Sequence, residues 1–276
     1  MLSRIYFNIR VLSLDVVLGA CCSALFLASF LNVELPKLIL LTLALAVWVI
    51  YTTDHLIDAY KINKSASSAR HAFHQKHFKV MLAVVLLATG IALYLVTLIP
   101  SPTRSWGFYL VGMVLVYFAI LTVWKQQSLF FKEVMVALVY TGGIFIGPLT
   151  ALEVSIPFKA WLLFTQFAVL AFVNLLEFSF YEQNIDRSDG QGSIVLKIGR
   201  RRTQRVIWIC LVLLLLSTGP LIIGFWQDLA MIKAQALVFL MSLTMASIML
   251  FKEFFKAKER YRMLGDGAFI FPVFFI

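Results

Sequence analysis

Two pairs of acidic residues have the type and spacing needed to bind a metal ion. Asp54 and Asp58 are four positions apart, and Glu182 and Asp186 repeat this spacing 128 positions further along the chain. Residues four apart lie on one face of a helix, so each pair would present two carboxylates in the same direction. Four carboxylates sharing one cavity would repel one another unless a divalent cation that prefers oxygen ligands lay among them.

Mg²⁺ is the cation that this pattern predicts. Proteins usually bind Mg²⁺ through one or two carboxylates together with the phosphates of a substrate. A diphosphate bridged by such ions is therefore the expected ligand of the cavity. The alternative interpretation is that the acids are solvated loop residues that balance the basic residues around them.

The elements that must position these acids are membrane-spanning helices. Hydrophobic residues make up 61% of the 276 residues and charged residues only 14%, which excludes a water-exposed surface of ordinary composition. A short apolar stretch after Gly265 predicts a partial ninth helix. The fold class is therefore all-α integral membrane, a bundle of eight to nine transmembrane helices. The eight full spans are predicted from apolar runs at 11–33, 38–57, 78–99, 105–124, 130–152, 158–181, 205–226 and 229–251.

The basic residues are distributed unequally between the two sides of this bundle. Twenty of the 24 Lys and Arg residues fall on the side of the N-terminus and of the acidic loops 54–79 and 182–205. Because basic loops stay in the cytoplasm, we expect this side to be cytoplasmic. The net charge of +10 then reflects topology and contact with anionic membrane lipid; no nucleic acid and no protein partner is implied. The four basic residues expected on the opposite side of the membrane are Lys37, Arg104, Lys159 and Lys233.

One membrane domain is expected over residues 1–276, because no linker or soluble segment interrupts the pattern. The equal spacing of the acidic pairs predicts two repeat-like halves, approximately 1–128 and 129–276. The two acid-bearing helices would cross the membrane in the same direction. A pseudo-twofold axis along the membrane normal would then bring both pairs to one site.

The second acidic loop resembles a signature of the UbiA superfamily of intramembrane prenyltransferases. That signature is D-x-x-x-D-x-x-x-G-x-x-T followed by a further glycine. This chain matches it with conservative changes at the first and fourth of these places. The first loop is similar to the N-D-x-x-D-x-x-x-D signature of the same family, with Asp54 and Asp58 as its last two acids. In the second loop the matching residues are Glu182, Asp186, Gly190, Ser193 and Gly199. Both signatures are altered in their first halves, where this chain has Ile50, Tyr51, Phe178 and Ser179.

The resemblance implies Mg²⁺-dependent transfer of a prenyl group from a polyprenyl diphosphate to an aromatic or other lipid-precursor acceptor at the cytoplasmic side of the membrane. It implies that Asp54, Asp58, Glu182 and Asp186 are catalytic residues that bind Mg²⁺, and that the Mg²⁺ in turn binds the diphosphate. The basic residues expected to bind the diphosphate are Lys64, Arg70 and Lys125. Aromatic faces would stabilise the allylic carbocation, and polar residues inside a span should face protein or a wet cavity. The candidates for the acceptor or prenyl pocket are Tyr51, Tyr117, Tyr140, Asn174, Glu177 and Tyr181.

Three other functions remain open at this point. The altered signatures would suit a non-catalytic relative that binds prenyl lipids. A small-molecule transporter would need a broken helix, for which the Gly and Pro residues of 142–148 are the nearest candidate. The histidines of 71–77 could suggest a di-iron centre, but all four histidines lie in the region 55–77, so a basic amphipathic helix at the membrane surface is the simpler interpretation.

Overall fold

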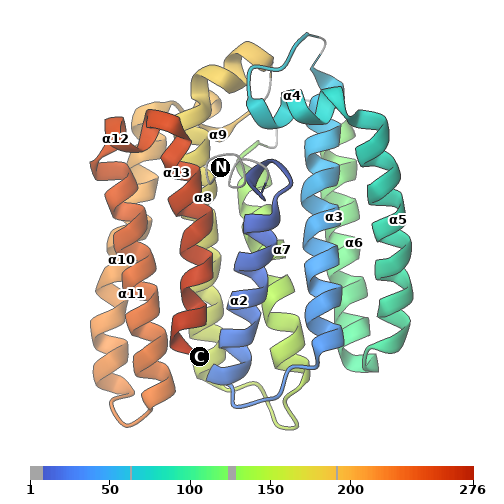
Figure 1. Cartoon of the computed structure of the whole chain (residues 1–276). Helices are drawn as coiled ribbons and strands as arrows, with labels where there is room; N and C mark the ends of the chain where they lie inside the picture. Colours follow the sequence, from blue (N-terminus) through green and yellow to red (C-terminus); the bar gives the residue numbers. More distant parts are fainter. Residues whose placement is uncertain (1–8, 63, 124–128, 191) are drawn as a thin grey trace.

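A bundle of long helices accounts for most of the protein (Figure 1). The computed structural model describes residues 9–62, 64–123, 129–190 and 192–276, and this part of the chain contains helices and no strand. All eight predicted spans are confirmed as long helices. They are α2 (Leu14–Phe30), α3 (Lys37–Lys61), α5 (Phe78–Leu98), α6 (Ser101–Val123), α7 (Leu129–Thr150), α8 (Phe158–Asp189), α10 (Arg200–Gly224) and α11 (Leu229–Leu250).

The lengths and surfaces of these helices identify a multi-pass membrane protein. Large apolar side chains such as Leu86, Leu87 and Leu216 are exposed on the outside of the bundle, where only lipid could cover so many of them. Within the described residues, six helices are long and apolar enough to cross a membrane: Lys37–Lys61, Phe78–Leu98, Lys132–Thr150, Phe158–Asp189, Arg200–Gly224 and Leu229–Leu250.

Three short helices lie at one end of the bundle, which we name the α4 end (Figure 1). They are α4 (Ala69–Lys76), α9 (Ile194–Ile198) and α12 (Lys252–Lys256). The Ser68 hydroxyl caps α4 by accepting a hydrogen bond from the backbone N–H of His71 (3.1 Å). The order long helix, short helix, long helix thus occurs twice, as α3–α4–α5 and as α8–α9–α10.

The two acid-bearing helices extend further than their apolar runs predict. α3 ends at Lys61 and α8 at Asp189, so both acidic pairs lie on the helices themselves and not in the loops that follow. α8 stops where Gly190 adopts a left-handed conformation (φ 69°), which glycine tolerates without a steric penalty. The apolar runs end earlier because the last helical turns face the charged α4 end.

The ninth element returns from the α4 end into the bundle. α13 (Arg260–Gly267) continues into the 3-10 helix η2 (Ala268–Phe275), which packs against α2. This helix starts at Arg260, ahead of the apolar stretch, so that charged residues enter the bundle with it. Gly19 on α2 permits the close approach, because a Cβ atom at this position would lie only 2.9 Å from Cβ of Phe269.

Replacing Gly19 by alanine is expected to destabilise the protein by about 1–3 kcal/mol, because the added methyl group overpacks the contact between α2 and η2. The free energy of unfolding can be measured by SDS titration of the micelle-solubilised protein. Gly90→Ala is the matched control, since no atom lies within 4 Å of a Cβ built there. Equal stability of the two variants would contradict the tight packing of η2 on α2.

Polar contacts fix the position of α8 relative to α11. The Lys159 ammonium pairs with Asp228 (2.6 Å) at the end opposite to α4. Further inside, the amides of Gln166 and Gln235 bond to each other in both directions (2.8 and 2.9 Å). Such hydrogen bonds between helices hold a membrane bundle in one register, which places the acidic end of α8 at a defined height.

Candidate functional site

The structure ties together the ends of α3 and α8 that carry the acidic pairs. The segment after α3 crosses to the end of α8, where Lys64 Nζ donates to the backbone oxygen of Ser188. Ser67 donates to Asp189 from its backbone nitrogen (3.1 Å) and from its hydroxyl group (2.6 Å). These contacts join residues more than a hundred positions apart and hold both acidic helix ends at the α4 end.

Two basic side chains interact electrostatically with acids of both pairs. The guanidinium of Arg70, on α4, interacts electrostatically with Asp54 of the first pair and Glu182 of the second. Lys132, near the start of α7, interacts with Asp54 and with Asp186. Each of these cations therefore lies within electrostatic range of acids from both helices. Lys132 is not among the basic residues that the sequence predicts for the diphosphate, so its interaction with both acidic helices is a feature that only the structure reveals.

Burial affects the ionisation of Arg70. Removal from water and the nearby Arg262 guanidinium lower the pKa of Arg70, whereas Glu182, Asp266 and Asp54 act in the opposite direction. A half-buried guanidinium forms strong charge-assisted hydrogen bonds with phosphate oxygens, and Mg²⁺ bound to the nearby carboxylates would offset their repulsion of a phosphate. Arg70 is therefore well placed to bind phosphate oxygens.

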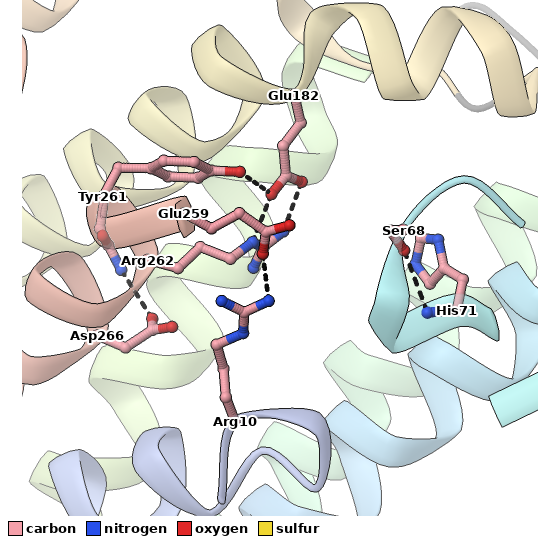
Figure 2. Close-up of polar contacts among 9 residues, drawn as sticks. Arg10, Ser68, His71, Glu182, Glu259, Tyr261, Arg262 and Asp266 are labelled. Carbon is pink, nitrogen blue, oxygen red and sulfur yellow. Dashed lines mark hydrogen bonds and ion pairs between the residues drawn. The ribbon is translucent and has the colours of Figure 1, made fainter. Parts of the chain in front are cut away.

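Glu182 is held by the ninth helix (Figure 2). Nε and Nη2 of Arg262 donate to its two carboxylate oxygens, and the Tyr261 hydroxyl donates to Oε1 (2.8 Å). The Arg262 guanidinium also lies over the ring of Phe178, 4.7 Å from its centroid. Phe178 occupies one of the altered signature positions, so the chain uses this position to support Arg262.

A second ion pair anchors the start of α13. Arg10 donates to Glu259 next to the Glu182–Arg262 pair (Figure 2). The N-terminal segment, α8 and α13 are thereby joined at the α4 end.

Two cavities lie beneath the charged end and share three lining residues. The polar cavity has about 330 Å³ of empty space and is lined by Asn174 and Asp266 together with Tyr51 and Tyr140. The apolar chamber has about 590 Å³ and lies between α3, α6 and α7. Tyr51, Val136 and Tyr140 border both cavities. Tyr51 also interacts electrostatically with Asp54, one helical turn away, so the cavities adjoin the acidic site.

The remaining predicted pocket residues lie elsewhere. The Tyr181 hydroxyl donates to the backbone oxygen of Ile248 (2.5 Å), and its ring stacks on Tyr261 (4.4 Å between centroids). Glu177 is fully buried, and both of its carboxylate oxygens lack a hydrogen-bond partner. Neither residue lines the two cavities. The side chain of Tyr117 and all of Lys125 fall outside the described residues.

The donor set constrains how a metal ion could bind. Among the described residues, no group of three or more His, Cys, Asp or Glu side chains is arranged to hold a metal ion. Both oxygens of Glu182 are already engaged by Arg262. The site therefore does not fit a metal held entirely by protein. It would suit Mg²⁺ that takes most of its ligands from a diphosphate and water, with Asp54 and Asp186, which both interact with Lys132, as protein ligands and Asp58 as a further predicted one.

Three of the four histidines cluster beside Arg70. The His55 ring lies 6.2 Å from that of His71 and 5.4 Å from that of His74, measured between centroids. Nδ1 of His74 donates to the backbone oxygen of Arg70 (2.9 Å). The expected helix at 69–76 is present, but His74 is buried, so α4 packs into the protein and is not simply a surface helix. Through the hydrogen bond from His74, the histidine cluster holds the backbone of Arg70 in place.

Acidification is expected to loosen α4. Burial, together with the positive charges of Arg70 and Arg262, lowers the pKa of His71 from 6.5 to about 4. An exposed His71 binds a proton between these pH values and the packed one does not, so packing is favoured above pH 6.5 and weakens as the pH falls toward 4. Lowering the pH from about 7 to about 5 should raise the opening equilibrium of residues 69–76 roughly tenfold, as measured by hydrogen exchange after correction for the intrinsic exchange rate at each pH. His71→Gln should remove most of this pH dependence and His77→Gln should not; an unchanged dependence in His71→Gln would contradict the assignment.

Long apolar helices identify an integral membrane protein, and carboxylates and cations gather at the α4 end of its bundle as a charged candidate site. The fold is that of a solved member of this class. The chain is similar to the apo structure of a UbiA homolog from Aeropyrum pernix K1, with a TM-score of 0.63 over 92% of this chain and 94% of that chain. The identity is 14%, so the similarity is one of fold. No protein-family model and no curated protein matches the sequence.

Proposed function

We propose that the protein is a UbiA-type prenyltransferase that transfers a prenyl group from a polyprenyl diphosphate to an aromatic or other lipid-precursor acceptor. The observation that carries the proposal is that Arg70 and Lys132 each interact electrostatically with acids of both helix ends, near an apolar chamber. This arrangement offers a diphosphate both cations and Mg²⁺ ligands, and it offers an isoprenoid chain an apolar environment. The twenty basic residues on this side of the bundle support a cytoplasmic location.

In this mechanism the chain's own residues bind and orient the donor. Asp54, Asp58 and Asp186 would hold Mg²⁺, which when bound neutralises the charge that develops on the departing diphosphate. Arg70 and Lys132 bind phosphate oxygens and stabilise the same charge. Glu182 can join the metal ligands only after Arg262 turns from it to the phosphates, and Lys125 remains a further predicted phosphate ligand.

The apolar chamber would hold the prenyl chain with its reactive carbon next to Tyr51 and Tyr140. These rings border both cavities and can stabilise an allylic carbocation by cation–π attraction, on the order of 2 kcal/mol in a dry site. The apolar walls exclude water, which would otherwise capture the carbocation. The donor therefore lies across the boundary between the charged end and the apolar chamber.

The test is Mg²⁺-dependent release of diphosphate from radiolabelled farnesyl diphosphate by the full-length protein in nanodiscs. Mass spectrometry of lipid extracts after overproduction or deletion of the protein should show a prenylated species gained or lost. Binding of farnesyl diphosphate without any release would instead identify a non-catalytic prenyl-lipid-binding relative. The observation that favours this second function is that Arg262 already occupies both carboxylate oxygens of Glu182.

A transporter is less well supported. Its expected broken helix around 142–148 is not found, since α7 runs from Leu129 to Thr150 with Pro148 inside it. The acids also lie at one end of the bundle and not at its midplane, where transporter sites are typically found. Uptake of farnesyl diphosphate into sealed proteoliposomes would contradict the enzyme proposal.

A further inference from the structure

A further pair of acidic residues lies at the polar cavity, and the donor site does not use it: Asp266 lines the cavity and Asp15 precedes the lining residue Val16. Asp15 on α2 and Asp266 on α13 interact electrostatically with each other. Neither belongs to the two signature regions. Asp266 accepts a hydrogen bond from Nδ2 of Asn174 (3.2 Å), and Asn174 and Asp266 both line the cavity.

Unpartnered polar atoms in and beside this cavity indicate that a ligand belongs there. Asn174 is 6% exposed and its Oδ1 atom has no hydrogen-bond partner. Asp15 is 7% exposed and its Oδ2 atom likewise has none. Buried polar atoms in proteins are almost always hydrogen-bonded. Both unpartnered atoms are acceptors, so the missing ligand must donate hydrogen bonds, as a hydroxyl group does.

The charges around the cavity favour a neutral ligand. Asp266 faces the carboxylate of Asp15 and the guanidinium groups of Arg262 and Arg70. Arg262 is already paired with Glu182, and Arg70 also interacts with Asp54 and Glu182, so these two cations only partly offset the charges of Asp15 and Asp266. An anionic ligand would meet two like charges at short range in a dry site, where repulsion is strong.

The walls of the cavity favour an aromatic ring. Tyr51, Tyr140 and Phe269 line it, and the rings of Tyr140 and Phe269 meet edge to face with centroids 5.4 Å apart. A flat ring can pack against such a pair in offset or edge-to-face geometry.

We propose that the polar cavity is the acceptor site, that it takes an uncharged phenol, and that Asp266 is the catalytic base. The inference rests on the proposed function. The phenol hydroxyl donates its proton to the Asp266 carboxylate, and its oxygen forms a bond to C1 of the prenyl group. The bond between C1 and the diphosphate oxygen breaks, and its electron pair leaves with the diphosphate. Asn174 is a positioning residue, because its amide holds the Asp266 carboxylate.

Binding of hydroquinone to the full-length protein in nanodiscs, measured by isothermal titration calorimetry, tests the acceptor site. Wild type should bind hydroquinone at least tenfold more tightly than 4-hydroxybenzoate, which carries an extra carboxylate. Asp266→Asn should bind hydroquinone about tenfold more weakly than wild type, a change of about 1.4 kcal/mol. The matched control is Asp228→Asn, a carboxylate at the opposite end of the bundle, which should bind hydroquinone as wild type does.

Two results would overturn the proposal: equal affinity of wild type and Asp266→Asn for hydroquinone, or tighter binding of 4-hydroxybenzoate. If Asp266→Asn does not fold, Asp15→Asn on another helix gives the same test, with about threefold weaker binding expected. Farnesyl diphosphate is titrated into the same samples. Failure of wild type to bind it would reject the proposed function, whereas normal binding of it with hydroquinone affinity independent of Asp266 and Asp15 would reject the acceptor site alone.

Discussion

Replacing Asp58 or Asp186 by alanine abolishes Mg²⁺-dependent release of diphosphate from farnesyl diphosphate, and we expect a rate loss of about 1000-fold or more. A loss of this size corresponds to about 4 kcal/mol of transition-state stabilisation, as expected for a metal that neutralises a leaving diphosphate. Asp58 lies on α3 and Asp186 on α8, so equal losses would show that both halves of the chain serve one site. Release of labelled diphosphate is measured at saturating Mg²⁺.

The control for these variants is Asp228→Ala, which removes a carboxylate at the end opposite to α4. It should release diphosphate at the wild-type rate. All variants should retain the helical circular dichroism spectrum of wild type, because neither Asp58 nor Asp186 belongs to the buried core. Substantial turnover in Asp58→Ala or Asp186→Ala would contradict the assigned metal roles.

The spans could be predicted because bilayer thickness fixes the length of an apolar run. The acidic pairs could be located because helical spacing places residues four apart on one face. Both rules depend on local sequence alone. They do not reveal where a side chain lies between neighbouring helices, and Tyr181 illustrates the difference: it was expected in the pocket, yet its hydroxyl group bonds to Ile248 of α11.

Arg262 and Asp266 show why the candidate site was only partly predicted. In the sequence Arg262 is one of many basic residues that mark the cytoplasmic side, and nothing local distinguishes it from Arg260, which is half-buried on the same helix. Its role depends on the packing of α13 between α8 and α2, a long-range contact. One signal was present, since Asp266 directly precedes a strongly apolar stretch, where an acid usually has a functional partner.

Replacing Arg262 by methionine is expected to lower the free energy of unfolding by about 3–5 kcal/mol. This is the usual cost of removing one partner of a buried ion pair, because the other charge is left without compensation. Arg262 is 8% exposed and forms two of the three hydrogen bonds that Glu182 accepts. Glu182→Gln in the Arg262→Met background should recover much of the loss, since a neutral amide is less costly to bury than an unpaired carboxylate.

Arg10→Met is the matched control, because Arg10 pairs with Glu259 at the more open edge of the same site. The Glu259 side chain is 35% exposed, so water can solvate it when Arg10 is removed, and exposed pairs contribute only about 0–1 kcal/mol. SDS titration of the solubilised protein measures both variants. Equal destabilisation by Arg262→Met and Arg10→Met would show that burial of the Glu182–Arg262 pair does not determine its contribution. A much larger effect of Arg262→Met would identify this pair as the contact that holds the ninth helix against α8.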